Sequence, residues 1–236
     1  MRHTRGVVGL IFLLVVTGCN VVNSDSGPTK TVEQEIDVGK AEAVRAEIRM
    51  SAGDLRVRGG GTKLMAGSER YSERTGPPAF RYDVTGSHGL LTVESPKTDG
   101  SIGKGGGDWN LRFGSTVPLD LYVSLGAGDA DLDVSTLPLQ HMEVKMGAGD
   151  MRLNLAGKYT KDVTAVVNGG AGDTRITLPG NMGVVVDAKI GIGGIQTDGL
   201  SKRDGIYYNE AYAEGKPAVH LEVHGGVGDI TLNVQK

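Results

Sequence analysis

Hydrophobic and polar residues alternate along much of this chain, and one alternating phrase occurs three times between Val123 and Leu178. In its second copy, Val144, Met146 and Ala148 share one parity, with Lys and Gly at the positions between them. An alternation of period two is typical of a strand that buries one face. We therefore expect each copy to begin with a half-buried strand whose apolar side chains, Ala148 included, point inward.

The parity of the apolar residues slips by one at a Gly-Asp pair in each copy. In the second copy the pair is Gly149-Asp150, and apolar residues follow at Met151, Leu153 and Leu155. Two outward residues between two inward ones make a sharp bend, and glycine supplies backbone angles that a β-carbon forbids. The sequence thus predicts two short strands joined by a glycine corner. The third copy repeats this, with Val167 and Ala171 inward before the corner and Ile176 and Leu178 inward after it.

The three phrases recur at a nearly fixed period. Their corner aspartates are Asp129, Asp150 and Asp173, so the steps are 21 and 23 residues. Such periods are the signature of stacked repeats, because one unit alone buries too little apolar surface to offset the entropy of ordering its backbone. We predict an all-β, single-domain β-solenoid of stacked rungs of 21–23 residues with Gly-Asp corners. Looser copies at 48–57, 188–197 and 223–234 extend the array.

Two interpretations of the recurring corner aspartates are open. In the first, the carboxylate braces the corner by accepting backbone N–H bonds, as in Asx-turns. In the second it binds calcium, because segment 169–176 resembles the calcium-binding nonapeptide G-G-x-G-x-D-x-U-x. The aspartate position of that motif holds other residues in the four best copies, and the period is not a multiple of nine. We favour the structural role, without metal, for Asp54, Asp129, Asp150, Asp173 and Asp229.

The N-terminal segment is typical of an export signal. Arg2 and Arg5 precede an apolar stretch, residues 7–16, that is far too short to span a membrane. The stretch ends in Val16-Thr-Gly-Cys19, which resembles the lipobox of bacterial lipoproteins. The resemblance implies cleavage before Cys19 and a lipid on its thiol; an ordinary signal peptide with an unrelated cysteine is the alternative. Cys19 is the only cysteine, so no intramolecular disulfide can form.

The chain divides accordingly into three parts. Residues 1–18 are the lipoprotein signal peptide, 19–31 a polar, turn-rich tether, and 32–236 one β-solenoid domain. The residue after the cysteine is Asn20 and not Asp. If the cell has two membranes, we therefore expect the lipoprotein in the outer membrane. The expected location is the exported side of the cell envelope, with the lipid on Cys19 as the membrane anchor. The net charge is −3, so the chain lacks the excess of basic residues that is typical of nucleic-acid-binding proteins, and no nucleic acid is expected as a partner.

The first half of the domain departs from the regular phrase. Strands begin at about Thr31 and lead to a first corner at 52–54, after which residues 68–78 form a polar stretch. Segments 80–84 and 90–94 are rich in strand-forming residues and predict a hairpin. The glycine-rich segment 103–107 has neither a following helix nor the Gly-Lys-Ser/Thr ending of a phosphate-binding loop, so we interpret it as a loop before a strand.

Several phrases match the pattern of a known family. They are the segments Met50-Ser-Ala-Gly-Asp-Leu-Arg-Val-Arg-Gly-Gly60, 117–129, 131–139 and 225–232. With them the sequence resembles the toast-rack family, a β-solenoid related to the C-terminal domain of LiaF-type cell-envelope stress proteins. The resemblance covers about residues 40–236, implies the solenoid fold and brings no catalytic residues. LiaF-type proteins place this domain after membrane-spanning helices, whereas a lipobox stands here instead.

The period is broken between residues 198 and 217, where the step from one corner, at 194, to the next, at 229, is 35 residues. Insertions in solenoids form loops on one face, often the recognition face. Tyr207, Tyr208 and Tyr212 lie in this insert and are candidate partner-binding residues, because tyrosine adds rigid amphipathic area. The alternative, which we favour slightly, is that Tyr207 and Tyr208 cover the open end of the core.

No residue pattern indicates catalysis or a cofactor site. His220, Glu222 and His224 alternate on the outward side of one strand, but no further ligands lie nearby in the sequence. The nucleophile motif G-x-S-x-G is absent. Asp131 and Asp133 stand where neighbouring copies hold Arg and Asn, which indicates a solvated face rather than an acid–base pair. We expect no enzyme activity, no catalytic residues and no cofactor.

The leading hypothesis is a non-enzymatic, lipid-anchored envelope protein. Its rigid solenoid would contact an unidentified envelope protein or glycan, in envelope-stress sensing or in adhesion. One alternative is a polysaccharide-acting enzyme on a β-helix, which requires carboxylates and basic residues that converge on one lateral face. A second alternative is a calcium-stiffened adhesin.

Overall fold

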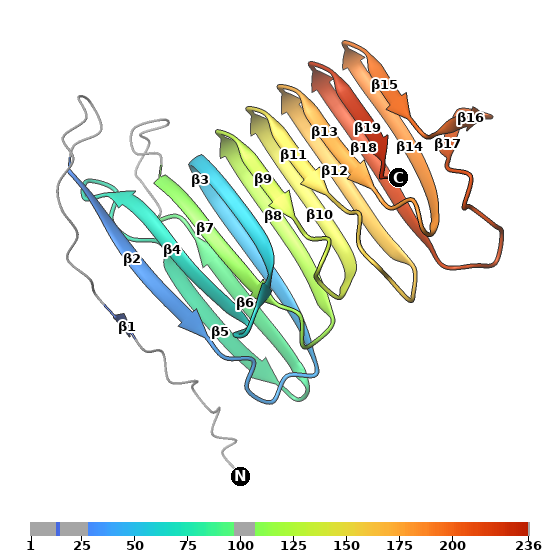
Figure 1. The fold of residues 1–236 in the computed structure, drawn as a ribbon. Helices are drawn as coiled ribbons and strands as arrows, with labels where there is room; N and C mark the ends of the chain where they lie inside the picture. Colours follow the sequence, from blue (N-terminus) through green and yellow to red (C-terminus); the bar gives the residue numbers. More distant parts are fainter. Residues whose placement is uncertain (1–12, 15–27, 97–106, 236) are drawn as a thin grey trace, which may run out of the picture.

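The computed structural model describes residues 13–14, 28–96 and 107–235, and in that part of the chain every regular element is a β-strand. The strands form a stack of rungs with two lateral faces, sheet A and sheet B (Figure 1). In spatial order sheet A holds β1 (Leu13–Leu14), β2 (Thr29–Ile36), β4 (Met65–Ser72), β7 (Gly107–Gly114), β3 (Ala43–Gly61), β9 (Ala130–Asp133), β11 (Met151–Asn154), β13 (Thr174–Leu178), β19 (Ile230–Val234) and β15 (Ile195–Asp198). Sheet B holds β5 (Ala79–Thr85), β6 (His88–Glu94), β3, β8 (Leu119–Ala127), β10 (Leu139–Ala148), β12 (Val163–Ala171), β18 (Ala218–Val227), β14 (Gly183–Ile192), β17 (Ile206–Tyr208) and β16 (Ser201–Arg203).

Each regular rung consists of a long strand in sheet B and a shorter one in sheet A, joined by a glycine corner. The rungs pair in parallel and in register, so inward residues stack in rows along the solenoid. One row runs through Val123, Val144, Val167, Val223 and Ala188, all of which are buried. Because such rows continue from rung to rung, one core serves the whole stack. The predicted all-β solenoid is confirmed.

The order of the rungs in space differs from their order in the sequence. The last rung, β18–β19, lies between β12–β13 and β14–β15, and it pairs in parallel with both (Figure 1). The chain therefore builds the outermost rung first and then returns to fill the inner position. The insert at 198–217 provides the length for this return, and its strand β17 pairs antiparallel with the outer edge of β14.

The corners are wider than the parity argument predicted. Ala148 and Ala171, expected to point inward, are exposed, because the chain already turns outward at the glycine that precedes each of them. The glycine after Ala148 is required: Gly149 has φ +122°, and a β-carbon there would lie 2.0 Å from the carbonyl oxygen of Gly128 on the next rung. Close stacking of corner on corner thus excludes a side chain at this position.

The N-terminal end of the stack contains a strand that the sequence interpretation missed. Residues 68–78 were expected to be a polar stretch, but β4 includes Ser68–Ser72 and lies antiparallel between β2 and β7. Strand β2 also begins at Thr29, inside the predicted tether 19–31. The predicted hairpin is confirmed as β5 and β6. Cys19, nearly all of the predicted signal peptide and most of the 103–107 loop lie outside the described residues.

Candidate functional site

The corner aspartates form a hydrogen-bonded ladder that follows the spatial order of the rungs. Oδ1 of Asp129 accepts the backbone N–H of Asp150 at 3.0 Å, and Oδ1 of Asp150 accepts that of Asp173 at 3.0 Å. Oδ1 of Asp173 accepts the N–H of Asp229 at 3.0 Å, and Oδ1 of Asp229 accepts the N–H of Gly194 at 2.8 Å. Each carboxylate therefore ties its own corner to the next one, and one oxygen of each is occupied by backbone.

Asp54 holds the corresponding place in β3 but differs from the other four. No ladder bond to the next corner reaches its carboxylate within residues 28–96 and 107–235. Asp54 instead pairs in register with Asp108 of β7, which lies along the edge of β3 opposite to β9. The first corner is thus joined to the stack by strand pairing and glycine contacts instead.

The outer face of sheet B neutralises charges along several of its strands. Acidic and basic residues two positions apart share the face, as in Glu143–Lys145 at 2.5 Å and Asp187–Lys189 at 2.8 Å. The hydrogen bond from Lys145 lowers the pKa of Glu143, and the hydrogen bond to Asp187 raises the pKa of Lys189. On these strands each acidic side chain therefore has a basic partner two positions away on the same face.

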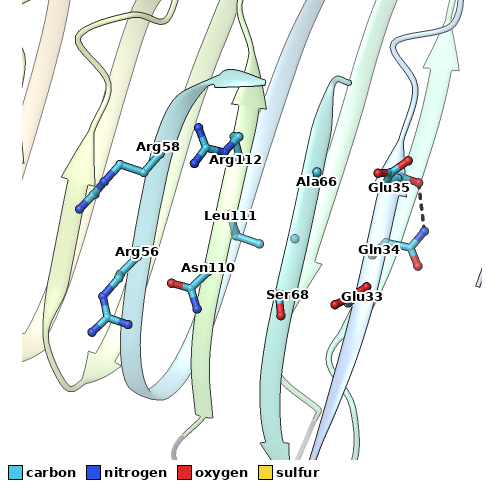
Figure 2. Close-up of a pocket in the computed structure, with 11 residues that line it drawn as sticks. Glu33, Gln34, Glu35, Arg56, Arg58, Ala66, Ser68, Asn110, Leu111 and Arg112 are labelled. Atoms are coloured by element: carbon cyan, nitrogen blue, oxygen red, sulfur yellow. Dashed lines mark hydrogen bonds between the residues drawn. The ribbon is translucent and has the colours of Figure 1, made fainter. Parts of the chain in front are cut away.

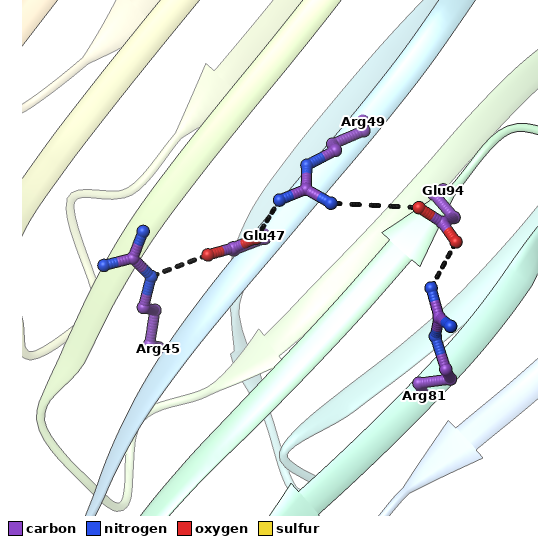
Figure 3. A network of polar contacts seen from close by, with 5 residues as sticks. All are labelled: Arg45, Glu47, Arg49, Arg81 and Glu94. Atoms are coloured by element: carbon purple, nitrogen blue, oxygen red, sulfur yellow. Dashed lines mark hydrogen bonds and ion pairs between the residues drawn. The ribbon is translucent and has the colours of Figure 1, made fainter.

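The same pairing widens into a network at the N-terminal part of sheet B (Figure 3). Nε of Arg45 donates to Glu47 at 2.7 Å, and Glu47 also pairs with Arg49 on the same strand. Arg49 reaches Glu94 of β6 at 3.8 Å, and Glu94 also pairs with Arg81 of β5. The three arginines are exposed and the two glutamates are partly buried beneath them, and all five are paired, so this network offers few free charges to a ligand.

The insert covers the end of the core, and its tyrosines fall into two groups. Tyr207 is 9% exposed and belongs to the core, so its ring is closed to a partner in this conformation. Tyr208 and Tyr212 are half-buried, with ring centroids 5.0 Å apart. The guanidinium of Arg203 lies 4.7 Å from the ring of Tyr208. A cavity of about 280 Å³ lies beside Tyr208 and His220 on this face.

Asn209, which sequence analysis did not single out, anchors the insert. It is 6% exposed, and its Oδ1 accepts the backbone N–H of Val184 at 2.9 Å. Its Nδ2 donates to the carbonyl oxygens of Met182 at 2.8 Å and of Pro179 at 3.3 Å. The side chain thus satisfies buried backbone groups at the start of β14, which a solvated loop would leave to water.

A groove of about 530 Å³ lies on the outer face of sheet A, across β2, β4, β7 and β3 (Figure 2). We call it the sheet A groove. Its floor is made of the small residues Ala66, Gly67 and Ser68 of β4. The register places two rows across the four strands: Glu33, Ser68, Asn110 and Arg56 form one, and Glu35, Ala66, Arg112 and Arg58 the other. One wall is therefore acidic and the other is basic.

Most of the charges of the groove walls are unpaired. Arg58 is the exception, because it donates to both the side chain and the backbone carbonyl of Asp131, at 2.5 and 2.9 Å. Arg56 and Arg112 form no ion pair or hydrogen bond with any residue that the structure describes, and their side chains are exposed. Glu33 and Glu35 likewise form no ion pair within the described ranges. Strand β4 separates β2 from β7, so Arg112 lies about two strand spacings, roughly 10 Å, from the acidic wall, and Arg56 of β3 lies one spacing further, at roughly 14 Å.

A buried carboxyl group lies under the groove floor. Glu69 of β4 is 0% exposed, and neither carboxyl oxygen has a hydrogen-bond partner among the residues that the structure describes. A β-carbon on Gly67 would lie 2.0 Å from its Oε1, so the carboxyl occupies the space beneath that glycine. Burial raises the pKa of Glu69 to about 8, so the group is protonated at neutral pH. Gln34, opposite Gly67 in the register, also has a buried, unpartnered Oε1.

Sequence analysis did not identify the groove residues. The alternation of apolar and charged residues in Val32–Ile36 and Leu55–Arg58 is a signal that the charged residues face outward, but it cannot indicate that the two segments share one groove. In the described ranges no three His, Cys, Asp or Glu residues gather in a group that could hold a metal ion. The same part of the chain contains no helix of the length and apolarity that crossing a membrane requires.

Comparison with solved structures finds a close relative in fold. A structure from Clostridium sporogenes, provisionally named a cell adhesion protein, superposes with a TM-score of 0.83 at 27% identity, over 88% of this chain and 100% of that one. A provisionally named adhesin from Bacteroides fragilis matches 88% of this chain and 98% of its own at 12% identity, with a TM-score of 0.32 that carries no argument.

The family comparison agrees with the architecture. No curated protein matches the chain. The family model described as the N-terminal domain of toast_rack, DUF2154, matches residues 25–195, which include the groove, the first five corners and every rung from β3 to β14, but neither β18–β19 nor most of β15. Since this match covers well over half of the sequence, the chain belongs to the toast_rack N-terminal domain family.

Proposed function

We propose that this protein is a non-enzymatic, adhesin-like envelope protein that binds another envelope component through its solenoid. The observation that carries the proposal is the sheet A groove, which has two arginines on one side and two glutamates on the other, none of them in an ion pair with any residue that the structure describes. Charges that are left unpaired on a rigid surface are available to a ligand, whereas the acidic and basic side chains of β10 and β14 in sheet B already pair with each other. The name of the Clostridium sporogenes structure supports adhesion rather than envelope-stress sensing.

Rigidity of the scaffold suits this role. The groove strands are held from below by buried Met65, Trp109, Leu111 and Phe113, and a binding surface on packed strands loses little conformational entropy when a ligand binds. The proposal includes export and attachment to the membrane by a lipid on Cys19, which would place the domain where it can meet other envelope components.

Attachment assays test the proposed function. Cells that express the full chain, cells that lack it and cells that carry Cys19→Ser are compared for attachment to a layer of the same cells. We expect a several-fold loss of attachment in the second and third strains, and incorporation of labelled fatty acid only when Cys19 is present. Unchanged attachment without the chain would overturn the proposal, as would turnover of a glycan or peptide substrate by the purified protein.

A further inference from the structure

We propose that the sheet A groove binds a short zwitterionic peptide, with its carboxylate on the Arg56–Arg112 wall and its ammonium on the Glu33–Glu35 wall. This inference rests on the proposed function and specifies its ligand class. It starts from the separation of the two walls by the small residues of β4.

The basic wall has the chemistry to bind a carboxylate. Arg112 of β7 and Arg56 of β3 lie on adjacent strands, in neighbouring rows, and both face outward without partners in the described ranges. A guanidinium presents a planar fork of donors that matches the two oxygens of a carboxylate. Arg58 is held by Asp131 beside them, and Asn110 adds an amide to the same wall (Figure 2).

The acidic wall has the complementary chemistry. Glu33 and Glu35 lie two residues apart on β2, so both point to the outer side, as their exposure shows. Two carboxylates on one wall favour a compact cation such as an ammonium group. Gln34, between them, faces the interior and is 2% exposed, so it leaves the wall purely acidic.

The distance between the walls selects the ligand. Two strand spacings, roughly 10 Å, separate β2 from β7, which carries Arg112, and a third spacing separates β7 from β3, which carries Arg56. An extended chain spans about 3.3–3.6 Å per residue, so the two free ends of a tripeptide are also about 10 Å apart. A peptide of this length, lying across the strands over Ala66 and Ser68, would place one end on each wall.

The lining also argues against a neutral sugar. Among the described residues no aromatic side chain lines the groove, and aromatic rings supply the flat, amphipathic contact surface that an uncharged ligand would need in place of ion pairs. Four unpaired charges would remain unsatisfied under a neutral glycan, whereas a zwitterion pairs with both walls.

Calorimetric titration of the full-length chain, purified in detergent, with tri-alanine tests the proposal. We expect binding that weakens at least about tenfold when the peptide is acetylated at its N-terminus or amidated at its C-terminus, because each change removes one charge-assisted contact. In the double variant Arg56→Gln/Arg112→Gln, amidation should make no further difference. In Glu33→Gln/Glu35→Gln, acetylation should make no further difference.

The matched control is Arg152→Gln, which removes an exposed arginine of β11 on the same face but outside the groove. Its affinity for tri-alanine should equal that of the unchanged protein. Ser68→Tyr, which fills the floor, should abolish binding, and thermal melts confirm that each variant is folded. Absence of tri-alanine binding, or equal affinity for the free and blocked peptides, overturns the proposal, and so does tight binding of a neutral oligosaccharide at the groove.

The attachment assay run with the groove variants separates the two proposals. If attachment requires the chain but survives both double variants, the groove proposal fails while the proposed function stands. If attachment does not require the chain at all, the proposed function fails, and the calorimetry alone decides what the groove binds.

Discussion

The backbone N–H of Asp173 donates to Oδ1 of Asp150 at 3.0 Å, across two neighbouring rungs. The carboxylates of Asp129, Asp150, Asp173 and Asp229 thus each brace the neighbouring rung. The interaction can recur only because the rungs are in register, and it passes to Gly194, the outermost corner, through Asp229. The bond therefore forms only when the two rungs are stacked.

Asp150→Ala should destabilise the protein by about 0.5–1.5 kcal/mol, because the N–H of Asp173 loses its acceptor. Asp150→Asn keeps a side-chain oxygen at the same position and should lose much less. Denaturant unfolding of both variants measures the difference. Asp54→Ala is the control, since its carboxylate has no ladder bond in the described part of the chain, and a loss as large as that of Asp150→Ala would contradict the ladder.

Gly149→Ala should be far more damaging than a typical glycine substitution. The residue has φ +122°, and the new β-carbon would lie 2.0 Å from a carbonyl oxygen of the neighbouring rung, so rungs must separate. We expect a loss of at least about 3 kcal/mol, or failure to fold. Gly60→Ala, also at positive φ but in open space, should cost only about 1 kcal/mol. Similar melting temperatures for the two variants would refute the role of corner stacking.

Glu69 should make stability depend on pH. Its pKa is about 8 in the folded protein against an ordinary value of 4.5, so between these values the folded state holds a proton that the unfolded state has lost. The stabilisation is fully present below pH 4.5 and is lost as the pH rises to about 8, by at most about 1.4 kcal/mol per pH unit. The Glu69→Gln side chain cannot ionise, so the stability of this variant relative to the wild-type protein should increase as the pH rises.

Urea unfolding at several pH values across this window checks the prediction. The exposed Glu210→Gln serves as the control and should follow the unchanged protein. A constant difference between Glu69→Gln and the unchanged protein at all pH values would show that the buried carboxyl is not the group that titrates.

Asn209→Ala should loosen the insert from the end of the stack. The substitution leaves the N–H of Val184 and the carbonyl oxygen of Met182 without their side-chain partner, at a cost of about 1–3 kcal/mol for buried backbone groups. Hydrogen exchange should show faster exchange at Val184, while Val144 in the middle of the stack stays protected. Unchanged exchange at Val184 would mean that strand pairing alone holds this end.

The sequence by itself determined the repeating unit. Alternation, glycine and aspartate recur in the same places in each phrase, and each feature acts over a few residues, so strand, corner and inward face could be predicted locally. The exposure of Ala148 was predicted wrongly, because the bend begins one residue earlier than the parity slip suggests. The alternation of inward and outward residues in β18 and in β14 fits an inner rung and an outer rung of the stack equally well.

Only the tertiary structure decided the order of the rungs and the composition of the groove. Strand pairing depends on register, and the rungs alternate so similarly that local pattern cannot rank them; the antiparallel β17 on the edge of β14 fixes β14 as the outermost rung and leaves the inner position to β18. In the same way, Glu33 and Arg56 become members of one row only because β4 and β7 lie between their strands. Contacts between residues distant in sequence arise from packing, and no local propensity encodes them.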